Sequence, residues 1–155
     1  MKVTDTKRVI MGFLGTGAST VADINLIVQL AIIALLAIGW AYGRDKKKIR
    51  IHGQFMVVAV LVNAAAIAFV MVPSFILGFG AITSNPIGIG SLISIAHPII
   101  GTSAWLIGVY LSWTWGLKPA TVECFKRKRL MKPVTYLWIL AAVLGVGFYV
   151  YYYIL

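Results

Sequence analysis

Four stretches of the sequence are about 20 residues long, mostly apolar, and free of Asp, Glu, Lys and Arg. They are residues 24–42, 53–72, 92–115 and 134–155. A helix needs about 20 such residues to cross roughly 30 Å of hydrocarbon. Membrane-spanning strands would show alternating apolar and polar residues, which these stretches lack. The sequence therefore predicts an all-α integral membrane protein, folded as an antiparallel four-helix bundle.

The composition supports this class. Hydrophobic residues make up 61% of the chain and charged residues 12%, against about 45–50% and 25% in soluble domains. These values exclude a soluble domain, a disordered chain and a disulfide scaffold. They also make nucleic acid an unexpected partner, although the formal net charge is +10. We expect membrane lipids and other membrane subunits as partners instead.

The segments between the spans are predicted from their turn-forming residues. Residues 1–23 are expected to be a retained interfacial segment before the membrane domain 24–155, with Asp23 capping the first helix. Pro73 should end the second helix, and the Gly-rich, uncharged residues 75–90 should form an apolar loop, with a partly re-entrant loop as the alternative. The third helix should end at Lys118 and Pro119. Pro133 suits the first turn of the fourth helix.

Basic residues indicate which way the chain faces. Eleven of the 14 Lys and Arg residues fall in the segments 43–51 and 118–133, and the other three lie near the N-terminus. Loops rich in Lys and Arg stay in the cytoplasm, so both segments should be cytoplasmic loops and both termini should lie outside. Anionic lipid is the expected partner of this basic surface. Its predicted members are Arg44, Lys46, Lys47, Lys48, Arg50, Lys126, Arg127, Lys128 and Arg129.

Aromatic and polar residues inside the spans have plain structural interpretations. Tyr149 and its aromatic neighbours up to Tyr153 are expected at the outer membrane interface, where amphipathic rings gather; a quinone or haem contact is the alternative. Asn25 and Gln29 lie four residues apart and are expected to form hydrogen bonds between helices. The single cysteine, Cys124, is expected to be a plain reduced thiol.

The spans contain no carboxylate, which argues against a proton pump or a cation transporter. The sequence also shows no nucleophile with a matching base, no phosphate-binding loop and no zinc-spaced cluster. A protein that is not itself an enzyme is therefore favoured.

The two histidines are the candidate cofactor-binding residues. His52 begins the second span, whereas His97 lies near the other end of the third span, so their depths differ by roughly 15–25 Å. Two such histidines cannot ligate one haem within one chain. Met56 follows His52 by one turn, and Met71 is expected on the same side as His97. A His/Met pair suits haem b or copper, and an ordinary helix contact is the alternative.

Several short motifs resemble a known family. They are Ile51-His52-Gly53-Gln54-Phe55-Met56, His97-Pro98-Ile99-Ile100-Gly101, Cys124-Phe125-Lys126-Arg127-Lys128 with Met131, and Leu137-Trp138 followed by Gly-Val-Gly-Phe-Tyr. Over roughly residues 22–155 the chain resembles the prokaryotic four-helix membrane family called domain of unknown function 420. That resemblance implies a prokaryotic cell membrane and a link to cytochrome oxidase assembly.

Three functions are consistent with these observations. The leading hypothesis is a non-catalytic accessory or assembly protein of a respiratory or other membrane oxidoreductase complex. The second is an electron-transfer protein that holds a b-type haem or copper through His97 or His52. The third is a purely structural small subunit of a membrane complex.

Overall fold

The computed structural model describes residues 12–116 and 121–155. Its elements follow in the order α1 (Thr20–Gly43), η1 (Lys46–Lys48), α2 (Ile49–Ala66), η2 (Ile67–Met71), α3 (Val72–Ser84), α4 (Ile89–Leu111), η3 (Ser112–Gly116) and α5 (Thr121–Tyr153). Four helical stretches in the described residues are long and apolar enough to span a membrane, namely Thr20–Gly43, Ile49–Ser84, Ile89–Trp115 and Arg129–Tyr153. The predicted all-α four-helix bundle is confirmed, and the chain is a multi-pass membrane protein.

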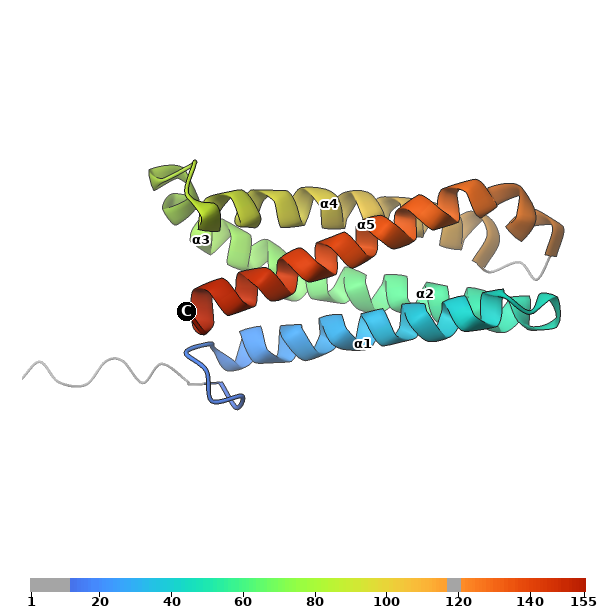
Figure 1. The fold of residues 1–155 in the computed structure, drawn as a ribbon, viewed down its shortest axis with the longest axis horizontal. Helices are drawn as coiled ribbons and strands as arrows, with labels where there is room; N and C mark the ends of the chain where they lie inside the picture. The colour runs from blue at the N-terminus through green and yellow to red at the C-terminus, as the bar shows by residue number, and fades with distance from the viewer. Residues whose placement is uncertain (1–11, 117–120) are drawn as a thin grey trace, which may run out of the picture.

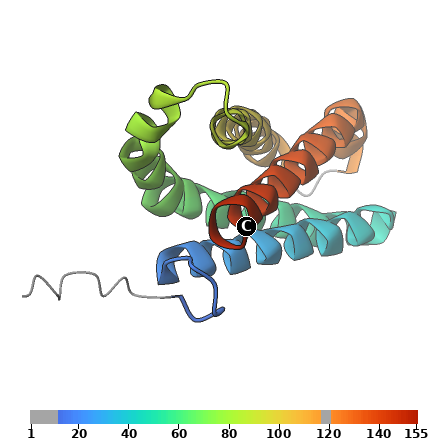
Figure 2. The same cartoon turned by 60° about the vertical axis from the view of Figure 1, so that its left-hand side comes forward.

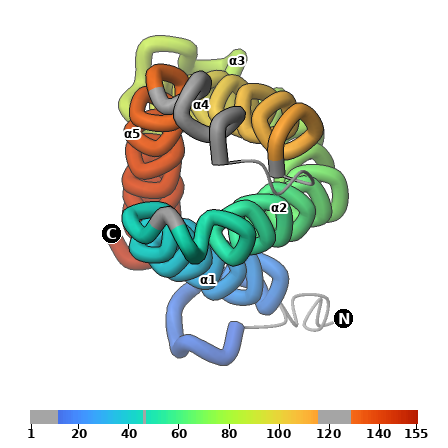
Figure 3. Tube along the Cα trace, turned by 90° about the vertical axis from the view of Figure 1, so that its right-hand side faces the viewer, coloured from blue at the N-terminus to red at the C-terminus, as the bar shows by residue number. Residues whose placement is uncertain are grey.

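Two antiparallel hairpins form the bundle. Helices α1 and α2 make one hairpin and α4 and α5 the other, and all four run along the long axis of the molecule (Figure 1). Viewed from one end, the four helices surround a common axis (Figure 3). The loop 44–48 lies at one end of the bundle, while the C-terminus and residues 12–19 lie at the other.

The core lies where the two hairpins meet. Its buried members are Ile32, Ala59, Val60, Ala104, Leu111, Val134 and Trp138. The indole Nε1 of Trp105 donates a hydrogen bond to the backbone oxygen of Val60 at 3.1 Å, which joins α4 to α2. Gly108 allows a close approach at the same level, because a Cβ there would lie 2.8 Å from the Trp138 ring.

The prediction of a loop over residues 75–90 is wrong. The chain continues from α2 through the π-helical turn η2 into α3, so Ile49–Ser84 is one helical stretch of 36 residues. The π turn changes the hydrogen-bond register, since the Val72 N–H donates to the oxygen of Ile67. Pro73 then stands in the first turn of α3, where the absent N–H is tolerated. The chain bends between α2 and α3, so that α3 leans away from α1 (Figure 2).

The start of the last helix also differs from the prediction. The predicted loop 118–133 is helical from Thr121 onward, and Pro133 lies inside α5 and not in its first turn. Residues 121–132 are rich in strong helix formers, which extend the helix ahead of the proline. Proline in a helix interior removes one backbone hydrogen bond and is accommodated by a kink. Lys118 and Pro119 lie outside the described residues.

Asp23 does not cap the first helix. The N-cap is Ser19, whose side chain accepts a hydrogen bond from Ala22 N at 3.3 Å. Asp23 is fully buried in the first helical turn. Its carboxylate accepts hydrogen bonds from Leu14 N at 2.9 Å and from the Tyr149 hydroxyl at 2.5 Å.

Tyr149 is therefore buried in the protein, whereas Tyr151 and Tyr152 are exposed as members of an interfacial belt would be. Its hydroxyl also lies 2.7 Å from Thr16 Oγ1. A second contact joins the same segments, because Gly17 N donates to the backbone oxygen of Tyr153 at 3.3 Å. Residues 12–19 are thereby attached to the end of α5.

Candidate binding cavity and the two histidines

His52 connects the two helices of the first hairpin. Its Nδ1 lies 2.6 Å from the backbone oxygen of Gly39. A carbonyl oxygen only accepts hydrogen bonds, so Nδ1 carries the proton and donates it. The imidazole ring covers Gly43, where a Cβ would lie 3.0 Å from Nδ1. Any larger residue at position 43 would push the ring away from its acceptor.

His97 makes the same kind of contact in the second hairpin. Its Nδ1 donates to the backbone oxygen of Ala141 at 2.9 Å. The ring covers Gly145, where a Cβ would lie 3.0 Å from Cε1. In both hairpins the side chain of a histidine on one helix forms a hydrogen bond with a small residue of the neighbouring helix and covers a glycine four residues further along that helix.

This hydrogen bond determines which nitrogen of each imidazole ring carries the proton. With the proton on Nδ1, the Nε2 atom of a neutral imidazole keeps its lone pair. Metal-binding histidines commonly have this arrangement, in which the other ring nitrogen donates to a carbonyl or carboxylate. Each Nε2 is thus able to accept a hydrogen bond or to ligate a metal.

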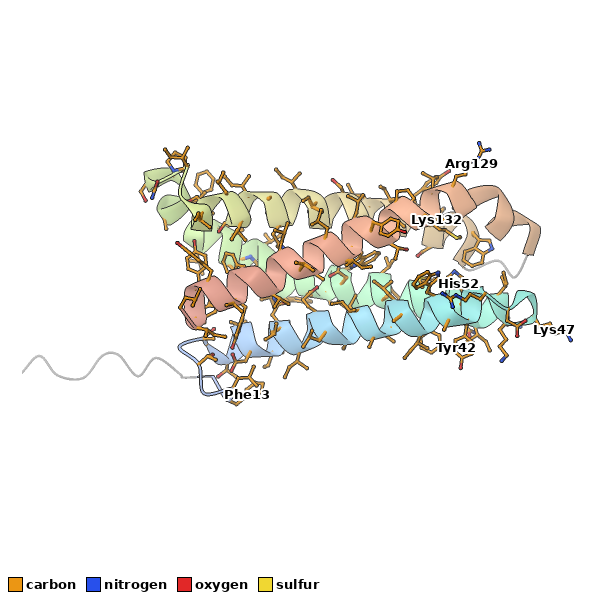
Figure 4. All side chains as sticks on the ribbon, viewed as in Figure 1. Phe13, Tyr42, Lys47, His52, Arg129 and Lys132 are labelled. Carbon is orange, nitrogen blue, oxygen red and sulfur yellow. The ribbon has the colours of Figure 1, made fainter. Side chains whose placement is uncertain are left out.

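The described surroundings of His52 include an aromatic ring. Its ring centroid lies 5.4 Å from that of Trp115, and the His52 side chain is buried. A Cβ at Gly39 would lie 2.6 Å from the Met56 methyl, so Met56 packs against the same stretch of α1. Figure 4 shows His52 near the end of the bundle where Lys47 lies.

The surroundings of His97 include a cavity of about 170 Å³ at the centre of the bundle. All four membrane-spanning segments contribute to its lining. The lining residues are Gln29, Asn63, Ile67, Met71, Val72, Phe75, Ile76, His97, Pro98, Gly101, Thr102, Trp138, Ala141 and Ala142. The predicted neighbours Met71 and His97 therefore line the same cavity. The π turn η2 supplies Ile67 and Met71, and such turns occur frequently at functional sites.

Three further polar residues line the cavity, and the sequence analysis did not place them in a site. They are Gln29 from α1, Asn63 from α2 and Thr102 from α4. The Gln29 Nε2 atom is buried and has no hydrogen-bond partner among the described residues, and the same holds for Asn25 Oδ1. These two atoms do not form the expected bonds between helices. The missing partner of Gln29 Nε2, which only the folded structure reveals, is the signal that identifies Gln29 as a member of this site.

The cavity extends from the core of the bundle to its lateral surface. Asn63 at its inner end is 5% exposed, whereas Ile76 at its α3 side is 67% exposed. Phe75 on α3 and Pro98 on α4 also line the cavity. A lateral surface of this kind would face hydrocarbon in a membrane that the four helices span.

The basic residues that the structure describes lie toward the end with the α1–α2 loop. Lys47 in that loop and Arg129 and Lys132 on α5 lie toward this end, opposite Phe13 (Figure 4). The Arg44 guanidinium lies over the Trp40 ring at 5.0 Å. Lys46, Lys126, Arg127 and Lys128 have side chains outside the described part of the structure.

The donor sets for metals are sparse. Among the side chains that the structure describes, which exclude those of Glu123 and Cys124, no three His, Asp or Glu residues lie together as a metal site. A b-type haem does not fit beside His97, because the cavity is smaller than the roughly 300 Å³ at which pockets for drug-sized ligands begin. Copper bound by His97 and Met71 is compatible with this space. No protein-family model, curated protein or solved structure matches the chain.

Proposed function

We propose that this protein is a non-catalytic accessory or assembly protein of a membrane oxidoreductase complex in a prokaryotic cell membrane. The observation that carries the proposal is helix α3, which packs little against the rest of the chain. Ile82 is its one buried residue, and Leu77 is 86% exposed. The link to an oxidoreductase rests on the family resemblance of the sequence motifs.

The exposed side of α3 suits a second membrane helix. A Cβ at Gly78 or Gly80 would meet no described atom within 4 Å. Glycines on a lipid-facing helix allow another helix to approach closely, and such small residues are enriched where membrane helices associate. The rings of Phe75 and Phe79 lie on the same helix, tilted by 60° with centroids 6.0 Å apart, and add apolar contact area.

Site-specific photo-crosslinking in native membranes tests this proposal. A photoreactive residue at Leu77 on α3 should form an adduct with a subunit of a haem- or copper-containing oxidoreductase. The same residue at Leu106, which is 55% exposed on α4, is the matched control and should form no such adduct. Deletion of the protein should lower the activity of that oxidoreductase.

Two glycine variants separate docking from folding. Gly78→Leu should abolish the adduct without changing the stability of the isolated protein, because the added side chain meets no described atom. Gly147→Leu places the same residue on another open surface of α5 and should leave the adduct unchanged. Recovery of the protein only as a free monomer, together with normal oxidoreductase activity after deletion, would contradict the proposal and favour a structural or unrelated role.

A copper-binding electron-transfer protein is the second candidate function. The Nδ1 hydrogen bond of His97 leaves Nε2 free to ligate, and the Met71 thioether lines the same cavity. Soft sulfur and imidazole ligands together favour Cu(I). Titration of the purified protein with Cu(I) against a competing chelator measures this directly. Binding of one equivalent that is lost in Met71→Leu would support this function, and no binding would exclude it.

We also propose that the end of the bundle that holds Lys47 and Arg129 lies in the cytoplasm. A thiol introduced as Lys47→Cys in a Cys124→Ser background should react with a membrane-impermeant maleimide in inverted vesicles but not in intact cells. Labelling in intact cells would reverse the orientation.

A further inference from the structure

We propose that the cavity beside His97 binds a phenolic ring carried on a lipid-soluble tail, the chemistry of a quinol. This binding site goes beyond the accessory role proposed above and does not depend on the identity of the partner. Four properties carry it: the volume of the cavity, its apolar walls, the polar residues Gln29 and His97 that line it, and its opening at the lateral surface.

The volume fits one six-membered ring. An apolar cavity of about 150 Å³ engineered into a soluble protein binds benzene, and this cavity measures about 170 Å³. Its walls are mostly apolar, with Trp138 and Pro98 offering flat surfaces to a planar ring. A fused tetrapyrrole exceeds this space, and a water molecule would leave most of it empty.

The hydrogen-bonding groups select a hydroxyl. His97 donates Nδ1–H to the Ala141 oxygen, so its Nε2 only accepts. Gln29 Nε2 is a buried donor without a partner among the described residues. A phenolic hydroxyl donates to one nitrogen and accepts from the other. A quinone carbonyl accepts only, so the oxidised ring satisfies Gln29 and leaves the lone pair of His97 unpaired.

The entrance suits a ligand with a hydrocarbon tail. Ile76 lines the cavity and is also 67% exposed on the lateral surface. A ring bound between Gln29 and His97 can therefore extend an alkyl substituent past Ile76 into the bilayer. Burial of an alkyl chain in hydrocarbon is favourable, so the ligand would be delivered from the membrane rather than from water.

Equilibrium binding to the purified wild-type protein in lipid nanodiscs tests the proposal. The probes are decylbenzoquinol kept reduced under argon, the corresponding quinone, and the quinol dimethyl ether, which has the same ring without an O–H group. We expect one saturable site for the quinol and about tenfold weaker binding of the other two, since each of them loses a hydrogen bond and leaves a polar group of the site unpaired. Equal binding of all three, or no saturable binding, would overturn the proposal.

Variants locate the site. Gly101→Leu should abolish quinol binding, because a Cβ at Gly101 meets only Ala141 at 3.7 Å and the rest of the side chain fills the cavity. Gln29→Leu should weaken binding about tenfold. Leu106→Phe, an exposed substitution on the same helix as Gly101, is the control and should bind like wild type. Quinol binding that survives both Gly101→Leu and Gln29→Leu in folded protein would place the site elsewhere.

The outcome is separable from that of the accessory proposal. Ring binding is measured on the isolated chain, whereas the α3 adduct is measured in native membranes. An isolated protein that fails to bind quinol but still forms the Leu77 adduct would overturn this inference alone. A protein that binds quinol but forms no adduct would overturn the accessory role alone.

Discussion

The α1–α2 hairpin and the α4–α5 hairpin contain the same contact in different surroundings. In each, a histidine Nδ1 donates to a backbone carbonyl of the other helix, and its ring covers a glycine. His52 then meets the ring of Trp115, while His97 faces a cavity. The contact by itself is a means of packing two helices, and His97 differs from His52 in that it also lines the cavity that all four membrane-spanning segments form.

This difference distinguishes a histidine that packs two helices from a histidine that lines a candidate binding site, although the residue type is the same. A histidine inside a membrane span is a functional-site hypothesis by default. Both histidines meet that description, yet among the described residues His52 is buried against Trp115, whereas His97 lines a cavity. The cavity, and not the imidazole, distinguishes the candidate site.

The largest expected effect comes from removing the glycines that the rings cover. Gly43→Leu and Gly145→Leu should each lower the free energy of unfolding by about 1–3 kcal/mol, because the new side chain displaces the histidine from its acceptor. The measurement is denaturant titration of the detergent-solubilised protein followed by circular dichroism. Gly147→Leu, on an open surface of α5, is the matched control. A loss in the control as large as in the two variants would show that the ring contacts do not matter.

A smaller effect is expected where the two hairpins are joined. Trp105→Phe keeps the aromatic ring but removes the indole donor to the Val60 oxygen. The expected loss is about 0.5–1.5 kcal/mol in the free energy of unfolding. Trp113→Phe, a change at an exposed tryptophan in η3, should be neutral in the same titration. Equal stability of Trp105→Phe and wild type would remove this bond from the account.

Replacing either histidine should lower the free energy of unfolding by the same amount, whereas only replacement of His97 should abolish ligand binding. His52→Phe and His97→Phe each lose one hydrogen bond to a carbonyl, worth about 1 kcal/mol. Decylbenzoquinol should then stabilise wild type and His52→Phe against unfolding, since a ligand that binds only the folded state raises its stability. His97→Phe should show no such stabilisation. Stabilisation of both variants to the same extent would contradict the distinction between the hairpins.

The smallest effect is expected in the loop that closes the first hairpin. Lys48 Nζ lies 3.9 Å from Asp45 Oδ2, and both side chains are about half exposed. Exposed pairs of this kind contribute about 0–1 kcal/mol. Lys48→Gln should therefore change the free energy of unfolding by no more than about 0.5 kcal/mol at physiological salt. A larger loss would mean that the loop, and not the His52 contact, holds the first hairpin.

The sequence identified the four spans because length and charge-free composition are nearly sufficient for a membrane helix. It failed over residues 75–90, where glycine and proline suggested a loop. The π turn at Ile67–Met71 moves the hydrogen-bond register, so that Pro73 falls in a first turn. A register change of one residue is a property of the folded backbone and leaves no pattern in the sequence.

The site was predictable only in part, for a related reason. His97 and Met71 were identified as candidates and do line one cavity. Gln29 was expected to form hydrogen bonds between helices. Its lack of a partner depends on which helices surround it, and the sequence does not show this. The Asp23–Tyr149 hydrogen bond joins residues 126 positions apart, and neither residue alone indicates it.

Histidine-selective ¹⁵N NMR on the nanodisc-embedded protein tests most directly whether the two histidines differ in function. His52→Gln and His97→Gln variants assign the two imidazole rings. On titration with decylbenzoquinol, the Nε2 resonance of His97 should shift saturably, and that of His52 should stay unchanged. A shift of the His52 resonance with His97 unaffected, equal shifts of both, or no shift of either would contradict the account.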